Sequence, residues 1–263
     1  MTSSEPCQTS TAGLLADLVR VRRTSGDRLA TPPAGSAPPD LDSAYALAAS
    51  LVAALGQPIA GWKIGASAPA GQRFLGLEEP FWGAILESEV LKAPALIPPI
   101  GAPFEVEPEI VMRLARDLRA RPDRDTAAAA IDQVAWGLEI NRPSFAAPFE
   151  AGGLCLVADK GVTRGLVVGA PIPDWRQRDL GRLPGQLVVD GDLGPEVTAM
   201  DAGFDPLDAL VWLAGDKARR GDPLRAGQWI ATGALGRARP LAAGQTATVL
   251  AGGEAVAHLA IAG

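Results

Sequence analysis

The chain has 263 residues, 48% of them hydrophobic and 21% charged, which is typical of a folded globular protein and not of a disordered or fibrous one. The formal charge of −6 and the scattered Lys and Arg residues argue against a nucleic-acid-binding protein, because phosphate recognition relies on clustered cations. With only Cys7 and Cys155 present, neither a disulfide framework nor a cysteine-based zinc site is expected, which fits a reducing cytoplasm.

The N-terminal residues 1–10 lack the basic start and apolar core of a signal peptide. No apolar run in the chain approaches the ~20 residues that a membrane helix needs. We therefore expect a soluble cytoplasmic protein with no membrane partner. Leu14, Leu15, Leu18 and Val21 recur at helical spacing, so residues 12–21 are predicted to form the first helix.

A Pro-, Gly- and Ser-rich stretch follows at residues 24–39 and predicts a loop. Asp40 or Asp42 then serves as the N-cap of a second helix that runs to Leu55. Residues 59–64 have a strand-like pattern, which places Lys63 among apolar neighbours. A short helix is expected over residues 68–75.

From about Phe81 onward, strand signals dominate the sequence. They predict strands at residues 104–114, 134–140, 154–157, 164–168, 187–189, 229–232, 246–250 and 255–261. Asp190-Gly191 predicts a hairpin turn, and residues 206–219 form one strong amphipathic helix that stops at Gly221. Helices gathered ahead of a strand-rich remainder indicate an α+β fold rather than alternating βαβ units.

Three glutamates, Glu105, Glu107 and Glu109, recur at every second position of one predicted strand. On a strand they share one face, with neighbours about 6.6 Å apart along the chain. Like charges in a row repel, so this face must be either well solvated or neutralised by a cation. An oxygen-preferring ion such as Mg²⁺ or Mn²⁺ is the natural partner, and an exposed acidic edge strand is the alternative.

Two further charged residues lie in apolar surroundings. Glu139 interrupts an otherwise apolar strand, and a buried carboxylate there needs a partner. Lys63, between Trp62 and Ile64, poses the same problem, although a structural ion pair would also explain it. Asp159 follows an apolar run and by default lies in a solvated turn. Spacing and composition thus predict an oxygen-ligand metal site and leave the substrate open.

Several motifs, in order along the chain, resemble the fumarylacetoacetate hydrolase superfamily and its 2-keto-4-pentenoate hydratase branch. Each motif is weak alone, but their common order is specific. They are DSAYAL at 42–47 (like AYAVQ), GWKIGAS at 61–67 (like GYKIGLTS), residues 72–83 (like QxxLGVxxPxxG), VEPEI at 106–110 (the Glu-x-Glu metal motif), LEI at 138–140 (the third ligand) and TGAL at 232–235.

The resemblance implies a fumarylacetoacetate hydrolase-like mixed β-roll with N-terminal helices. Residues 1–80 would be a helical segment packed on a catalytic domain at 81–263. The implied metal is Mg²⁺ or Mn²⁺, bound by Glu107, Glu109 and Glu139. The resemblance also implies Lys63 as an active-site residue, and Asp159 is predicted as its acid–base partner. The predicted substrate-binding residues are Ser67, Arg142, Lys160 and Thr232. Family members usually assemble, so a homo-oligomer is expected.

Two segments depart from the family pattern. Residues 139–144 read EINRPS where hydratases commonly have EIVDSR, and residues 159–162 read DKGV in place of DNAS. A family Asp and Arg are therefore displaced or lost. Arg142 or Lys160 would then supply the cationic contact to a second substrate carboxylate, a hypothesis that rests on charge and position alone.

The activity implied by the resemblance is addition of water to a 2-hydroxy-2,4-dienoic acid, giving a 4-hydroxy-2-oxo acid. A decarboxylase acting on a 2-oxo-dienedioate is the runner-up, because the same electrophilic chemistry serves both reactions. A C–C hydrolase ranks third, since it needs a histidine near the metal and His258, the only one, lies on the last predicted strand. A non-catalytic relative is the remaining alternative, against which the four residues Lys63, Glu107, Glu109 and Glu139 argue.

Overall fold

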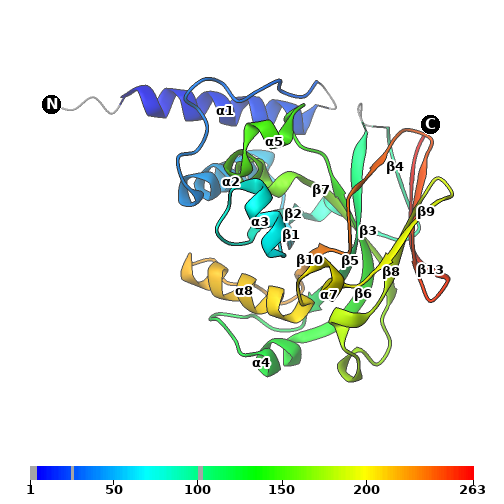
Figure 1. Cartoon of the computed structure of the whole chain (residues 1–263). Coiled ribbons are helices and arrows are strands. Elements are labelled where there is room, and N and C mark those ends of the chain that lie inside the picture. The colour runs from blue at the N-terminus through cyan, green and yellow to red at the C-terminus, as the bar shows by residue number, and fades with distance from the viewer. Residues whose placement is uncertain (1–4, 25–26, 100–102) are drawn as a thin grey trace.

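The computed structural model describes residues 5–24, 27–99 and 103–263. An eight-stranded sheet has the order β2-β1-β10-β5-β6-β7-β3, with β11 paired to β5, and a five-stranded sheet has the order β4-β13-β12-β8-β9. In Figure 1, α1, α2, α3 and α5 gather to the left of the large sheet, α8 and α4 lie below it, and the small sheet lies to the right. This arrangement confirms the predicted α+β fold.

The elements have the following bounds. The large sheet contains β1 (Ile59–Gly65), β2 (Phe81–Leu86), β3 (Val90–Lys92), β5 (Phe104–Leu114), β6 (Ile131–Asn141), β7 (Thr163–Pro171), β10 (Trp229–Ala234) and β11 (Arg239–Leu241). The small sheet contains β4 (Ala95–Ile97), β8 (Gly185–Val189), β9 (Asp192–Val197), β12 (Thr246–Ala251) and β13 (Glu254–Ile261). The helices are α1 (Glu5–Arg23), α2 (Leu41–Leu55), α3 (Pro69–Leu75), α4 (Arg124–Ala129), α5 (Pro148–Ala151), α6 (Gly153–Ala158), α7 (Ala199–Ala202) and α8 (Pro206–Arg219), with short 3₁₀ turns η1 (Glu87–Glu89), η2 (Lys160–Val162), η3 (Trp175–Gln177) and η4 (Leu180–Arg182).

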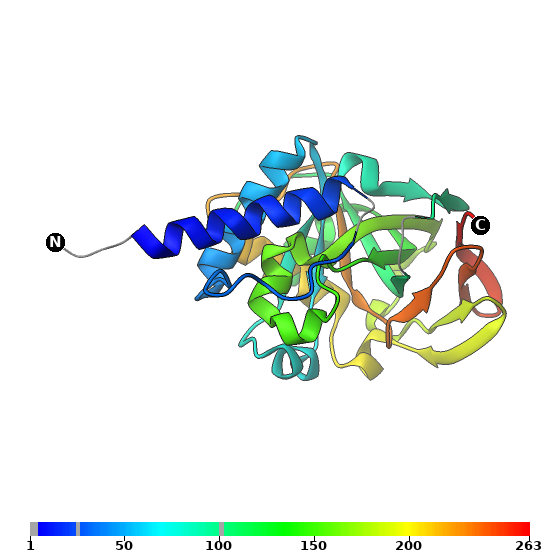
Figure 2. The same ribbon diagram turned by 90° about the horizontal axis from the view of Figure 1, so that it is seen from above.

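The strongest local signals are confirmed. Asp40 caps α2 by accepting a 2.8 Å hydrogen bond from the backbone N–H of Ser43, and Gly56 ends the helix in the left-handed conformation. The Asp190-Gly191 dipeptide makes the turn between β8 and β9, with both residues at positive φ. The first helix is longer than predicted, and seen from above it lies across the outer side of α2 (Figure 2).

One predicted strand is wrong: residues 154–157 belong to helix α6. The run is short and apolar, and such a run fits a buried helix as well as a buried strand. Tertiary packing decides between them, because Cys155, Val157 and Ala158 are enclosed by the first two helices in one apolar cluster. The short helices α4, α5 and α7, of six, four and four residues, have no hydrophobic period long enough to be recognised in the sequence.

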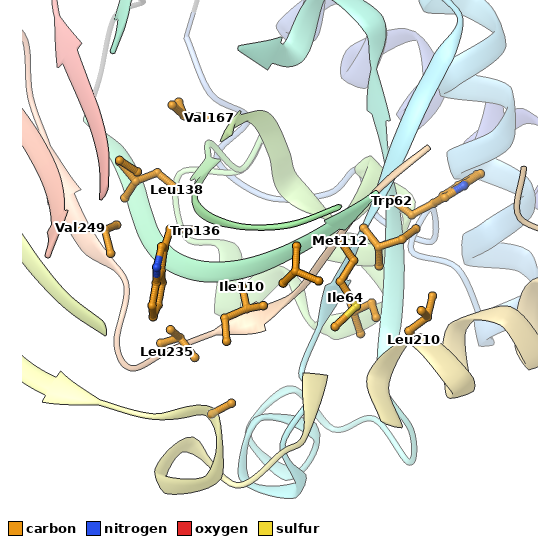
Figure 3. Close-up of a cluster of buried hydrophobic side chains, with 14 of the residues drawn as sticks. Trp62, Ile64, Ile110, Met112, Trp136, Leu138, Val167, Leu210, Leu235 and Val249 are labelled. Atoms are coloured by element: carbon orange, nitrogen blue, oxygen red, sulfur yellow. The ribbon is translucent and has the colours of Figure 1, made fainter. Parts of the chain in front are cut away.

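Alternation along the strands divides the large sheet into two faces. Trp62, Ile64, Met112 and other side chains of one face pack against α8, while Trp136 and its neighbours pack against the small sheet (Figure 3). The opposite face carries a smaller cluster in which Ile85 of β2 packs with Leu166 of β7. These two strands lie far apart in the sheet order, so the sheet curls and this second face is its inside.

The proposed boundary at residue 80 stays a prediction. Strand β1 lies before it, yet β1 pairs in parallel with β10, so that Lys63 is opposite Ala231. In the part of the chain that the structure describes, no helix is long and apolar enough to cross a membrane.

A lysine between two tryptophans anchors β1 from the side opposite Lys63. The Nζ atom of Lys217 on α8 lies 3.3 Å from the ring centroid of Trp62 and 4.1 Å from that of Trp82. Trp82 also stacks on Tyr45 of α2 at 3.9 Å. Burial lowers the pKa of Lys217 to about 8, although the ion pair with Asp222 opposes this shift. The cluster ties α2 and α8 to the strands that present Lys63.

A buried arginine joins α1 to the segment after α6. Arg22 donates to Oδ1 of Asp159 at 2.8 Å and to the backbone oxygens of Asp159 and Thr163. Ser144 donates to the same carboxylate through its backbone N–H and its hydroxyl, both at 2.7 Å. The Asp159 charge is thus fully satisfied within the fold.

We expect wild-type stability, relative to Lys217→Met, to increase between about pH 8 and pH 10.5. The unfolded lysine still binds a proton in this range, with an ordinary pKa of 10.5, whereas the folded one has lost it. The measurement is urea unfolding of both proteins at a series of pH values. A difference in unfolding free energy that is flat or falls with pH would contradict this expectation.

Asp159→Asn and Arg22→Met are each expected to lower the free energy of unfolding by about 3–5 kcal/mol, because each leaves a buried charge without its partner. The double variant should lose less than the sum of the two. Chemical denaturation of the three variants measures this coupling. Additive losses would show that the two side chains do not act as a pair.

Candidate metal centre and pocket

The carboxylates come together because β5 and β6 pair antiparallel in one register. Glu107 lies directly opposite Glu139, and Glu109 lies opposite Gly137. Each of Glu107, Glu109 and Glu139 offers an oxygen that lies within 4.8 Å of those of the other two. All three side chains project from the inner face of the curled sheet, as the alternation of β5 requires.

Burial leaves part of this cluster without hydrogen-bond donors. Glu109 and Glu139 are fully buried, and Oε1 of each has no hydrogen-bond partner. The partners that exist are few: the N–H of Gly233 donates to Glu109 at 3.0 Å, and Nδ2 of Asn141 donates to Glu107 at 2.9 Å. Unpaired buried carboxylate oxygens such as those of Glu109 and Glu139 are costly, and a group of three converging carboxylates is the donor set that a hard divalent cation takes.

The raised pKa values of two of these glutamates also favour a bound cation. Burial, and then the nearby charge of Glu139, raise the pKa of Glu107 to about 7. Burial, with Glu139 and Glu107, also raises the pKa of Glu109 well above its ordinary value. The fold therefore holds these carboxylates together only by taking up protons or a cation.

Lys63 is the cation that the fold itself supplies. Its Nζ lies 3.3 Å from Oε2 of Glu139, and its side chain is almost wholly buried. Burial alone would lower the pKa of Lys63, but the charges of Glu139, Glu107 and Glu109 outweigh it and raise the pKa. Lys63 is therefore held as an ammonium beside the carboxylates.

Close backbone packing forms one wall around Lys63. A Cβ added to Gly83, which pairs with Lys63, would lie 2.2 Å from the carbonyl oxygen of Lys160. A Cβ on Gly161 would lie 3.3 Å from Cδ of Lys63. The turn at residues 160–162 also holds Val162 at a φ of 61°, a strained conformation for a β-branched residue. Glycine at 83 and 161 allows this turn to touch the lysine.

A pocket of about 920 Å³ opens onto the cluster. Its polar lining includes Lys63, Ser67, Glu105, Glu107, Asn141 and Arg237. Its apolar lining includes four aromatic rings, Phe74, Phe81, Phe149 and Phe204. Phe74 and Phe149 are mostly exposed and meet edge to face at 4.9 Å, so they form part of the outer rim.

The structure brings some of the predicted substrate-binding residues to this pocket and not others. Ser67 lines it, and its hydroxyl donates to the backbone oxygen of Thr232 at 2.8 Å. Thr232 is buried behind the wall, with its hydroxyl donating to the carbonyl of Ile110. Thr232 therefore joins β10 to β5 and does not line the pocket.

The two predicted cations after Glu139 and Asp159 also lie outside the pocket lining. Lys160 is buried, and its Nζ donates to Glu89 at 2.8 Å and to the carbonyls of Ala84 and Thr163. Burial lowers the pKa of Lys160 to about 8. Arg142 is buried as well, and burial followed by the charges of neighbouring arginines lowers its pKa.

Asp159, predicted as an acid–base residue, does not line the pocket either. Its carboxylate accepts hydrogen bonds from Arg22 and Ser144, as described above. These hydrogen bonds account for the burial of the Asp159 carboxylate. They do not support an acid–base role for this residue.

Three polar groups of the site are not predicted from the sequence. Asn141 belongs to a segment that departs from the family motif, although its position two residues after Glu139 places it on the same strand face. The backbone N–H of Gly233 has no side-chain signal at all. Arg237 lies in a loop whose path toward the pocket depends on strand pairing, which the sequence does not show.

No family model matches the chain. A 2-keto-4-pentenoate hydratase of Paraburkholderia phymatum is 31% identical over 215 residues, which cover 77% of this chain and 79% of that protein. The solved structure of 4-oxalocrotonate decarboxylase from Pseudomonas putida G7, complexed with magnesium and adipate, superposes with a TM-score of 0.84 and 20% identity over 99% of both chains. Fumarylpyruvate hydrolase from Pseudomonas aeruginosa, in complex with Mn²⁺ and pyruvate, gives a TM-score of 0.59 at 15% identity over 78% of this chain and 91% of that one.

The two solved structures, at 20% and 15% identity, establish the fold. The hydratase from Paraburkholderia phymatum establishes the family, because the match spans most of both proteins. The chain belongs to the 2-keto-4-pentenoate hydratase family and has the fold of the fumarylacetoacetate hydrolase superfamily.

Proposed function

We propose that this chain is a metal-dependent hydratase that adds water to a 2-hydroxy-2,4-dienoic acid of the 2-keto-4-pentenoate type and releases a 4-hydroxy-2-oxo acid. The observation that carries the proposal is the cluster of three carboxylates, two of them fully buried, beside Lys63 at the bottom of a pocket. Family membership supports the reaction class, since the matching relative is named as such a hydratase. A homo-oligomeric, cytoplasmic state remains a prediction.

Mg²⁺ or Mn²⁺ is the proposed cofactor, and Glu107, Glu109 and Glu139 would hold it. The all-carboxylate donor set and its unpaired buried oxygens fit a hard divalent cation. When bound, such an ion supplies electrophilic stabilisation of the negative charge on the oxygens of a 2-oxo acid.

The residues of the chain would then position the substrate and the protons. Lys63, kept as an ammonium by the glutamates, orients the substrate carboxylate and is a poor base in that state. Asn141 holds the carboxylate of Glu107 in place through its 2.9 Å hydrogen bond. The buried ring of Phe81 and the aliphatic side chains of the lining limit the access of bulk water, which strengthens the attraction between Lys63 and an anionic substrate.

Net hydration proceeds through protonation of the dienol at C5 and addition of water across C3 and C4. The 2-hydroxyl proton is lost, one proton is gained at C5 and one at C3, and the hydroxyl group of water adds at C4. Asp159, Arg142, Lys160 and Thr232 contribute in this proposal by holding the walls of the pocket.

Two matched variants can distinguish a proposed metal ligand from a neighbouring glutamate on the same strand. Glu109→Gln is expected to lower the affinity for Mn²⁺ about 100-fold or more, because a charged ligand is lost. The same variant should raise the stability of the metal-free protein, because it removes one of three mutually repelling carboxylates. Calorimetric titration with Mn²⁺ and urea unfolding without metal measure the two effects.

Glu105→Gln is the matched control, since Glu105 lies on the same face of β5 and lines the pocket without belonging to the cluster. It should keep the Mn²⁺ affinity of the wild type within a few-fold. If the two variants lose equal affinity, or if neither loses any, the ligand assignment is wrong.

The reaction is tested with 2-hydroxypenta-2,4-dienoate and Mg²⁺, following the loss of dienol absorbance, the 4-hydroxy-2-oxo product and CO₂. The wild type is expected to form the hydrated product without CO₂. Lys63→Met should lose at least about 100-fold in kcat while still binding Mg²⁺, because the ammonium that orients the substrate is removed. Release of CO₂ from a 2-oxo-hexenedioate without hydration would favour a decarboxylase instead, and a fully active Lys63→Met would remove Lys63 from the mechanism.

A further inference from the structure

The loop at residues 235–238 carries an arginine over the strand that holds the metal ligands. β10 pairs with β5 as far as Ala234 opposite Glu109, and β11 resumes with Arg239 opposite Val106. Pro108 lies at the break between the two ladders, where the N–H of Leu235 donates to its carbonyl at 2.8 Å. The loop therefore leaves the sheet beside the metal cluster and is fixed at both ends.

Arg237 differs from the other arginine of this region in its partners. Arg239 is bound to Asp192 by an ion pair and to the carbonyls of Asp192 and Leu187. The guanidinium of Arg237, in contrast, lines the pocket and makes no hydrogen bond or ion pair with any described residue. Glu105 lines the same pocket, but no ion pair with a nitrogen–oxygen distance within 4.0 Å joins it to Arg237.

The described lining residues include two cations, and they lie at different depths. Lys63 is buried beside the glutamates, whereas Arg237 is exposed, so one cation marks the floor and the other the rim. The lining also contains the buried Phe81 and the half-buried Phe204. An arginine in this place is either a solvated surface side chain or the partner of an anionic group on a bound ligand.

We propose that Arg237 binds a second carboxylate at the far end of the substrate, so that the enzyme prefers dicarboxylic dienoic acids over monocarboxylic ones of the same length. This inference rests on the proposed function, because the metal and Lys63 hold the first carboxylate and thereby orient the ligand toward the rim. A carboxylate that enters an apolar-lined pocket needs a partner, and a guanidinium offers two parallel donors for it. Arg142 and Lys160 do not line the pocket, so neither supplies this contact.

The test compares two unreactive ligands that differ only in the terminal carboxylate, 2-oxoadipate and 2-oxohexanoate. Both are titrated calorimetrically into the full-length, Mg²⁺-loaded protein. The wild type is expected to bind 2-oxoadipate about 10-fold or more tightly than 2-oxohexanoate, as expected of a charge-assisted contact. Arg237→Ala should reduce this ratio to near one, and Arg237→Lys should restore part of it. Arg73→Ala, an exposed arginine of α3 outside the pocket lining, should leave the ratio unchanged.

Equal binding of the two ligands by the wild type would overturn the inference, as would a preference that survives in Arg237→Ala. Assays with 2-hydroxyhexa-2,4-dienedioate and 2-hydroxypenta-2,4-dienoate separate this inference from the proposed reaction. If the wild type prefers 2-oxoadipate through Arg237 but transforms neither dienoic acid, the carboxylate site stands and the hydratase proposal fails. If it hydrates a dienoic acid without discriminating between the two ligands, the reaction stands and the role of Arg237 is refuted.

Discussion

Repulsion among three closely spaced carboxylates, two of them fully buried, is the constraint on which the rest of this site depends. Their oxygens lie within 4.8 Å of one another, and the pairing of β5 with β6 brings Glu107 opposite Glu139. Solvent does not reach Glu109 or Glu139, so protons, Lys63 or a cation must balance the charge. Strands of the sheet lie on both sides of the cluster. The packing of the whole fold therefore offsets the electrostatic repulsion among the three carboxylates.

Strand alternation lets one sheet serve stability and function at the same time. On β1, Trp62 and Ile64 enter the large apolar core, while Lys63 between them turns to the inside of the curl. On β5, Ile110 belongs to the same core, and Glu109 beside it belongs to the site. The metal cluster therefore rests on backbone whose other face is close-packed, which limits how far the carboxylates can move apart.

Several buried charges near the site stabilise its walls. The pairs Arg22–Asp159 and Lys160–Glu89 are almost completely enclosed and are saturated by backbone and side-chain partners. They hold the turn at residues 160–162 against β2, and this turn touches Lys63. The charged side chains behind the pocket wall therefore fix the geometry of the site. The charged side chains that line the pocket are the ones that can contact a ligand.

The sequence by itself determined the α+β class, the capped helix over Leu41–Leu55, the strand over Phe104–Leu114 and the glutamate spacing, because these depend on neighbours a few residues away. Family motifs then added Glu139 to the pair Glu107 and Glu109. Only the tertiary structure decided that residues 154–157 are helical, that the charge of Asp159 is paired, and that Arg237 faces the pocket. The physical reason is that the partner of a buried charge, and the environment of a short apolar run, come from segments distant in the chain. Arg22, for example, is 137 residues from Asp159.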